Sequence, residues 1–156
     1  MTRKSRVRKT ARHKVMDLIA RRDHSELELR HKLAQYEYTE SEIDDAIAFA
    51  KANRWLAPPE ELAKRVASRL DNKRKGHRYI ELYLRSKGLP PVEKDSENEI
   101  SKGRALVYSK IGAQLREALD SQGRIDYESR KKIHRLLANR GFDDDTIRQV
   151  IDSLND

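Results

Sequence analysis

The side chains of this sequence that could take part in chemistry are mainly basic, and they are concentrated in three blocks. Residues 1–14 contain seven Lys and Arg and no acid, residues 64–78 contain seven and one acid, and residues 124–140 have a net charge of +4. The segments 15–63 and 141–156 have net charges of −5 and −4. Clustered bases are typical of a surface that binds a polyanion. The alternative interpretation is that they are solvated helix faces, and that the first block is a disordered tail, a functional arm, or both.

The basic blocks provide the candidate contacts to nucleic acid or to a nucleoprotein. A helix-turn-helix arrangement, in which a third helix enters the major groove, is not favoured. The expected third helices, at 39–47 and 143–151, begin with acids that would repel phosphates. The placement of the bases instead favours contact with a nucleic-acid backbone or with a protein groove. The candidate residues are Arg3, Lys4, Arg6, Arg8, Lys9, Arg12, Arg69, Lys73, Arg74, Lys75, Arg78, Arg130, Lys131, Lys132, Arg135 and Arg140.

No set of catalytic residues is predicted. The five histidines include no pair four residues apart, which argues against a helical zinc motif, and the six glycines form no phosphate-binding loop. The acids at 143–145 match the start of a helix, where carboxylates offset the helix dipole. Trp55, Tyr79 and Tyr83 could stack on bases, although packing between modules is the favoured interpretation. We therefore expect no enzyme activity, no metal and no cofactor.

The composition excludes several classes of protein. The chain has 156 residues and no cysteine, which excludes disulfides and thiolate zinc sites. Its apolar runs are far shorter than the about 20 residues that span a bilayer, and its basic beginning lacks the apolar stretch of a secretory signal. We therefore expect a soluble, cytoplasmic protein. Because 37% of the residues are hydrophobic and the net charge is +8, several thin cores are expected rather than one thick core.

Apolar residues recur at helical spacing through nearly the whole chain, and no convincing alternation indicates strands. Two helix starts carry a capping box, in which Ser25 is followed by Glu28 and Thr39 is followed by Glu42. Asp143 is expected to cap the last helix. The sequence therefore predicts an all-α fold of about eight or nine helices with about ten residues each.

The predicted helices repeat in groups. Residues 29–47 align without gaps on residues 133–151, and the segment 80–91 joins the same register. A repeat of this length in an all-helical chain indicates tandem three-helix modules, whereas chance similarity of amphipathic helices is the weaker interpretation. We expect an elongated, curved array of about three modules.

Each aligned copy has a similar turn before its third helix. Tyr38, Leu89 and Phe142 occupy the same position, where an apolar side chain would fill the corner between two helices. Gly88 and Gly141 stand where a left-handed residue would end the preceding helix. The middle copy lacks the apolar positions of the other two in its third helix, so we expect that helix to be short or frayed and the segment around it to be a flexible joint.

These observations predict four segments. Residues 1–11 form a basic arm that we expect to be flexible, and residues 12–57 form the first module. Residues 58–100 form a second module with a degenerate third helix, and residues 101–156 form the third module.

Three strings, in order, resemble the RecX family, whose members regulate the bacterial recombinase RecA. The string ARRDHSELELRHKL (20–33) is similar to the opening motif of the family, and SRLDNKRKGHRYIELYLRSKGL (68–89) is similar to its central block. The string LLANRGFDDDTIRQVI (136–151) resembles its closing repeat, and Trp55 with Leu56 matches an aromatic–leucine junction. The sequence departs from the family pattern at APPEEL (57–62), where two aspartates and an Arg-Phe pair are usual, and at Gly76-His77-Arg78, where a Gly-Pro pair is usual.

The resemblance implies tandem three-helix repeats, in agreement with the periodicity. It also implies a monomeric protein that binds in the groove of the RecA–single-stranded-DNA filament, with weaker binding to double-stranded DNA. Such binding would limit filament growth, ATPase and strand exchange in DNA repair, homologous recombination and the SOS response. The alternative hypothesis, from the bases alone, is a stand-alone basic helical protein that binds or shapes DNA.

Overall fold

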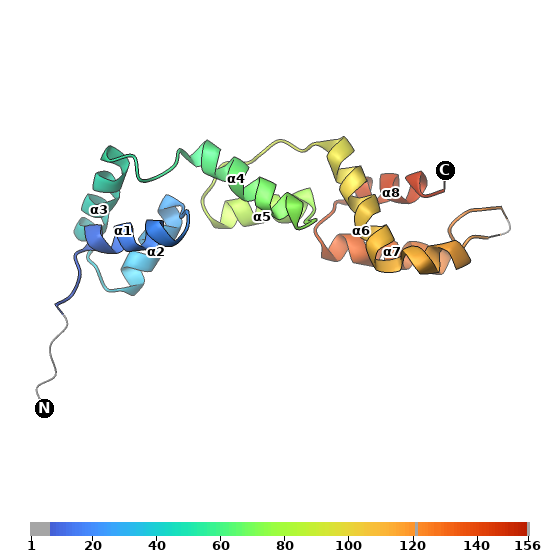
Figure 1. The fold of residues 1–156 in the computed structure, drawn as a ribbon, viewed down its shortest axis with the longest axis horizontal. Helices are drawn as coiled ribbons and strands as arrows, with labels where there is room; N and C mark the ends of the chain where they lie inside the picture. The colour runs from blue at the N-terminus through green and yellow to red at the C-terminus, as the bar shows by residue number, and fades with distance from the viewer. Residues whose placement is uncertain (1–6, 121, 156) are drawn as a thin grey trace, which may run out of the picture. The chain divides into compact units, whose positions relative to one another are not determined.

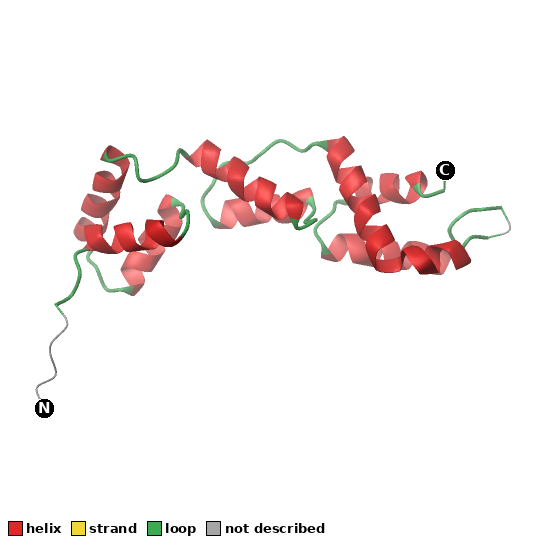
Figure 2. Ribbon diagram, viewed as in Figure 1, coloured by secondary structure: helices red, strands yellow, loops and turns green. Residues whose placement is uncertain are grey.

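The computed structural model describes residues 7–120 and 122–155, which form eight α-helices and no strand (Figure 1; Figure 2). Within these residues an isolated antiparallel bridge joins Leu119 to Ile125, and no helix is long and apolar enough to cross a membrane. The all-α fold predicted from the periodicity is confirmed. The helices are α1 (Ala11–Arg21), α2 (Glu26–Gln35), α3 (Glu40–Ala52), α4 (Pro59–Asn72), α5 (His77–Ser86), α6 (Ser96–Glu117), α7 (Tyr127–Asn139) and α8 (Asp144–Ser153).

The chain forms two compact units. Unit 1 consists of the residues up to 63 together with 86–90, and unit 2 consists of residues 64–85 together with 91–156. In unit 1, α1, α2 and α3 pack against one another, and in unit 2 α6, α7 and α8 do the same. The larger part of α4 and nearly all of α5 belong to unit 2.

The predicted helix starts are confirmed. Ser25 accepts a hydrogen bond from the Glu28 N–H while the Glu28 side chain accepts one from the Ser25 N–H, and Thr39 and Glu42 form the same reciprocal pair. Asp143 accepts from the N–H of Thr146 at the start of α8. Each cap stabilises its helix by about 1 kcal/mol, because it satisfies an N–H that has no partner within the helix.

A shared left-handed residue reveals the repeat in the backbone. Glu37, Gly88 and Gly141 have φ values of 62°, 65° and 88° at aligned positions of the three copies. At the first and third copies the N–H of the left-handed residue and the N–H of the residue after it bond back to the preceding helix, as in a Schellman motif. The sequence indicated this conformation for the two glycines but not for Glu37, whose residue type gave no signal. The residue after each turn is at least partly buried, as expected for the apolar residue that fills the corner.

Among the described residues, two clusters of buried apolar side chains form separate thin cores. The core of unit 1 comes from α1, α2 and α3, and the core of unit 2 comes from α6, α7, α8 and the loop before α7. Leu29 and Ile133 are fully buried at aligned positions, and so are Leu33 and Leu137, so the aligned copies bury equivalent residues. The complete burial of these side chains contributes about 2 kcal/mol each.

The short, frayed helix expected within residues 90–100 is not present as a separate element. Residues 91–95 are not helical, and Asp95 then caps α6, a helix of 22 residues. Two prolines at 90 and 91 disfavour a helix there, since neither has an N–H to donate and each restricts the residue before it. Unlike the expected joint, the first turns of α6 are packed, with Glu99 and Lys102 buried.

The aligned turns predict opposite responses to substitution. Glu37→Gly removes a side chain from a left-handed residue that is exposed, and we expect a gain of about 1 kcal/mol in the free energy of unfolding. Gly141→Ala strains the backbone and places a Cβ 2.4 Å from the Tyr79 Cβ, so we expect a loss of about 2 kcal/mol or more. Urea denaturation followed by circular dichroism measures both changes, and changes of the same sign would contradict the shared turn.

Candidate nucleic-acid interface

The candidate bases of unit 1 are held by partners of their own. Arg3, Lys4 and Arg6 lie outside the described residues. The Arg8 guanidinium donates to the Tyr36 carbonyl oxygen at 2.6 Å, and the Lys9 ammonium lies 2.5 Å from a carboxylate oxygen of Asp17. The hydrogen bond from Lys9 lowers the pKa of Asp17. These bases therefore contact the body of unit 1 as well as solvent.

Arg12 connects α1 to α3. Its guanidinium donates to both carboxylate oxygens of Asp45 at 2.8 Å and lies 4.2 Å from the centroid of the Phe49 ring. The hydrogen bond from Arg12 lowers the pKa of Asp45. Because this cation is offset by a carboxylate in a bidentate pair, it contributes less to attraction of a polyanion than its charge suggests.

Unit 2 brings the middle basic block next to the end of the third. Lys73, Arg74 and Lys75, named here the basic turn, follow α4, and Gly76 then donates its N–H to the Arg140 carbonyl oxygen at 2.8 Å. The Arg140 guanidinium donates in return to the Lys73 carbonyl oxygen at 3.2 Å. Residues 67 positions apart in the sequence therefore lie side by side.

Two glycines permit this approach. A Cβ on Gly76 would lie 2.3 Å from the carbonyl carbon of Gly141, a distance that real Cβ atoms do not adopt. The basic turn and Arg140 therefore share a surface only because the turns before α5 and α8 cross at residues without side chains. The Lys75 ammonium lies 4.6 Å from the Tyr79 ring centroid, which places its charge over an aromatic face.

A buried ionic network supports the basic turn from beneath. The Lys102 ammonium pairs with Glu99 and lies 2.5 Å from an Asp71 oxygen, and the side chains of Lys102 and Glu99 are 5% and 4% exposed. Glu99 also accepts the N–H of His77, the first residue of α5, at 2.9 Å. The network therefore joins the end of α4, the start of α5 and the first turns of α6.

Sequence reasoning missed this network, although a signal was present. Glu99 and Lys102 occupy positions of α6 that share a helix face with Leu106, a fully buried residue. Charged residues on an apolar face can indicate a buried ion pair, an interpretation that was not considered for these two residues from the sequence alone. In the packed structure Glu99 and Lys102 form a buried pair.

Two further bases of the third block, Arg130 and Lys131, contact residues at or just before the start of α7. The Arg130 Nε donates to the Ile125 carbonyl oxygen at 3.1 Å, and the Lys131 ammonium lies 3.2 Å from Glu128. Lys132 and Arg135 are exposed on α7, and Arg78 is exposed on α5. Trp55 is a packing residue, but it packs within unit 1 and not between modules as expected, since its ring lies on the core of unit 1 and meets Phe49 edge to face.

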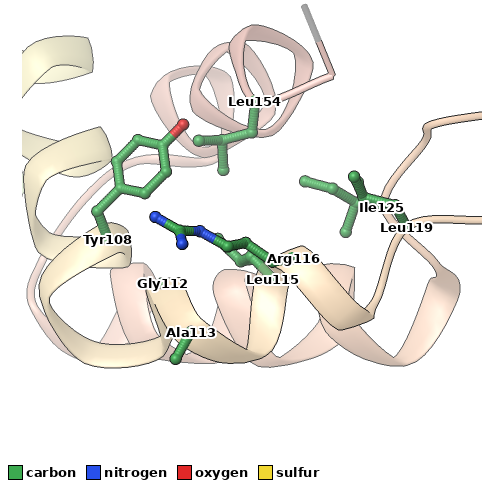
Figure 3. Close-up of a pocket in the computed structure, with 8 residues that line it drawn as sticks. All are labelled: Tyr108, Gly112, Ala113, Leu115, Arg116, Leu119, Ile125 and Leu154. Atoms are coloured by element: carbon green, nitrogen blue, oxygen red, sulfur yellow. The ribbon is translucent and has the colours of Figure 1, made fainter.

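A separate pocket of about 470 Å³ lies between α6, the loop before α7 and the end of α8 (Figure 3). The Tyr108 and Arg116 side chains lie on the α6 side of this pocket, and Leu154 lies opposite them. None of the candidate bases lines it. Within the described ranges, no group of three or more His, Asp or Glu side chains is arranged to hold a metal ion. The pocket is lined by Tyr108, Gly112, Ala113, Leu115, Arg116, Leu119, Ile125 and Leu154.

Known proteins resemble this chain over most of its length. A family model described as RecX, first three-helix domain, matches residues 11–49. The regulatory protein RecX of Chlorobium limicola is 30% identical over 140 residues, which cover 89% of this chain and 86% of that protein. The regulatory protein RecX of Actinobacillus pleuropneumoniae serotype 5b is 29% identical over 145 residues, with coverage of 92% and 91%. The crystal structure of RecX from Lactobacillus salivarius has a similar fold, with a TM-score of 0.76, 19% identity and coverage of 93% and 94%.

The buried network predicts a strong effect of removing one charge. Lys102→Met leaves the Glu99 carboxylate buried without its ammonium, and we expect a loss of about 3 kcal/mol in the free energy of unfolding. The double variant Lys102→Met, Glu99→Gln is expected to regain part of this loss, because a Gln oxygen can still accept from His77. Urea denaturation followed by circular dichroism tests both, and a loss below about 1 kcal/mol in the single variant would contradict the network.

Asp143 predicts a dependence of stability on pH. Burial alone would raise the pKa of its carboxyl, but hydrogen bonds from Lys94 and Thr146 outweigh burial and lower the pKa to about 2. Because this folded-state pKa lies below the unfolded value of about 3.9, the interaction stabilises unit 2 fully above about pH 4 and is lost as the pH falls towards 2. For a side chain that is 35% exposed, water screening reduces the contribution to about 1 kcal/mol.

Asp143→Asn is the matched variant, since Asn still caps a helix but does not titrate. We expect the wild-type protein to lose about 1 kcal/mol more than this variant between about pH 5 and pH 2. Urea midpoints across this range measure the difference. Parallel curves for the two proteins would show that the Lys94–Asp143 pair contributes nothing.

Proposed function

This chain belongs to the RecX family of regulatory proteins, and from this premise we propose that it binds the RecA–single-stranded-DNA filament and inhibits RecA. Binding in the filament groove would limit filament growth, ATPase and strand exchange, and so regulate DNA repair, homologous recombination and the SOS response. The protein would act as a monomer in the cytoplasm and without catalysis of its own.

The observation that carries this proposal is the surface formed by the basic turn and Arg140. These cations are contributed by two parts of the chain. Arg140 contacts a carbonyl group and Lys75 contacts a ring, while the nearby carboxylates of Asp71 and Glu99 are engaged by Lys102. A fixed group of cations with this placement suits a polyanion whose phosphates are presented along a groove. The filament provides such a polyanion together with a protein wall.

The acids at the starts of α3 and α8 favour this mode over reading of bases in a duplex. Glu40 and Glu42 lie in the first turn of α3, and Asp144 and Asp145 lie in the first turn of α8. In a helix-turn-helix arrangement these ends would approach the major groove, where carboxylates and phosphates repel.

The second candidate function is a stand-alone protein that binds DNA through its bases alone. It is favoured by the same cationic surface, and it differs in one measurable respect. A filament regulator binds the RecA filament more tightly than the bare strand at equal salt, whereas a stand-alone DNA-binding protein shows no such preference. Direct binding measurements on both substrates, each at several salt concentrations, separate the two functions.

Reversal of charge on the basic turn tests the proposal. We expect the purified protein to suppress the DNA-dependent ATPase of RecA from the same organism on preformed filaments, at concentrations that leave bare DNA unbound. The triple variant Lys73→Glu, Arg74→Glu, Lys75→Glu is expected to weaken this suppression by about tenfold or more, since each reversed charge removes a phosphate contact and adds a repulsion.

The control is a triple reversal at exposed bases elsewhere in unit 2, at Lys110, Arg116 and Arg148, which changes the net charge equally. It is expected to retain most of the suppression. No effect of the wild-type protein on RecA would refute the proposed function. If the two triple variants lose suppression of the RecA ATPase equally, the basic turn has no specific part in the proposed function.

A further inference from the structure

The outward face of α4 forms a shallow polar groove in unit 2. The groove has a volume of about 680 Å³, and all of its lining residues are exposed. Residues four positions apart on a helix lie above one another, so the lining side chains form two parallel rows. Each row is about 12 Å long, at 1.5 Å per residue. The rows consist of Lys64, Ser68 and Asn72, and of Arg65, Arg69 and Lys73.

The charge of this groove is positive along its whole length. Four of the six lining residues are cations, and none is acidic. Asp71 is the one acid in the sequence between Lys64 and Lys73, and its carboxylate is turned towards α6, where it accepts from Asn98 and Lys102. On α4, Asp71 therefore faces the buried network, whereas Glu60 and Glu61 lie in the first turn of the helix, one turn before the exposed cations of the groove.

We infer that this groove binds the phosphate backbone of single-stranded DNA. The cations would contact phosphate oxygens, and Ser68 and Asn72 would donate neutral hydrogen bonds between them. This inference rests on the proposed function and deepens it, because it assigns the α4 face to the DNA strand rather than to RecA. Lys64, Arg65, Ser68 and Asn72 are absent from the candidates that the sequence indicated.

The density of charge favours one strand over a duplex. A strand carries about one phosphate per 3.4 Å, so about three or four phosphates lie along 12 Å, which matches the four cations. A duplex carries twice this charge in the same length. No aromatic side chain lines the groove, so it offers no platform for bases, and we expect binding without sequence preference.

The groove continues into the basic turn, since Lys73 belongs to both. The Asp71–Lys102 contact and the Glu99–His77 hydrogen bond fix the end of α4 and the start of α5 on α6. The two cationic surfaces therefore have a fixed relation within unit 2. A strand that follows α4 would reach the basic turn and Arg140 without a change in the protein.

The experiment measures binding of a short fluorescent single strand of mixed sequence to the full-length protein, without RecA, across a range of salt. Lys64→Ala with Arg69→Ala is expected to reduce the salt slope by about 1.4 and to weaken binding about 20-fold at 0.1 M salt. Lys64→Arg with Arg69→Lys is expected to bind nearly as the wild type does, because the contact with phosphate depends mainly on the positive charge, which both substitutions keep. An unlabelled duplex of the same length is the competitor. If it displaces the fluorescent strand as well as an unlabelled single strand does at the same concentration of strands, the preference for a single strand is contradicted.

The matched control is Lys110→Ala with Arg148→Ala, which removes two exposed cations from α6 and α8. It is expected to change the slope by less than half as much, and circular dichroism verifies that each variant folds. Equal losses in the two double variants, or an unchanged slope in the α4 variant, would overturn the inference.

The RecA ATPase of the same variants separates this inference from the proposed function. If the α4 variant loses suppression of ATPase but binds the bare strand normally, α4 contacts RecA, and the inference fails while the proposed function stands. If the strand binds through α4 but the wild-type protein has no effect on RecA, the proposed function fails, while the inference that the groove binds single-stranded DNA is upheld.

Discussion

A buried lysine and glutamate on one helix hold together the part of the molecule that carries its most concentrated positive charge. Lys102 and Glu99 lie on the inner face of α6, and between them they contact Asp71 at the end of α4 and the first N–H of α5. Two buried charges are costly unless they are paired and hydrogen-bonded, and here each has a partner. Because the pair lies within α6, the arrangement of the three helices is fixed by its contacts to Asp71 and to the His77 N–H rather than by the pair itself.

The bases of the two units have different kinds of partner. In unit 1, Arg12 is paired with Asp45 and Arg30 is paired with Asp44, so these two cations connect helices. In unit 2, the guanidinium of Arg140 contacts a carbonyl and the ammonium of Lys75 contacts a ring, neither of which cancels the charge. The four cations of the basic turn and Arg140 therefore lie together on one surface of unit 2. This difference makes unit 2 the candidate surface for a polyanion.

The repeat in the sequence is preserved most clearly in a turn. Glu37, Gly88 and Gly141 share a left-handed backbone, although only two of them are glycine. The turn tolerates Glu at the first copy because that residue is exposed, whereas at the third copy the Tyr79 backbone and Cβ leave no space for a side chain. The same local conformation thus serves as a simple helix end in unit 1 and as a close crossing of two turns in unit 2.

The sequence by itself determined most of the helices, their caps, the left-handed turns at the two glycines and the family to which the chain belongs. These features depend on residues a few positions apart, as in the pairs Ser25 with Glu28 and Thr39 with Glu42, so a local pattern is sufficient to predict them. Only the tertiary structure decided which bases share a surface, which are offset by acids, and which charges are buried. Arg140 with Lys73, and Lys102 with Asp71, are 67 and 31 residues apart, and no local pattern specifies a contact that the packing of distant helices creates.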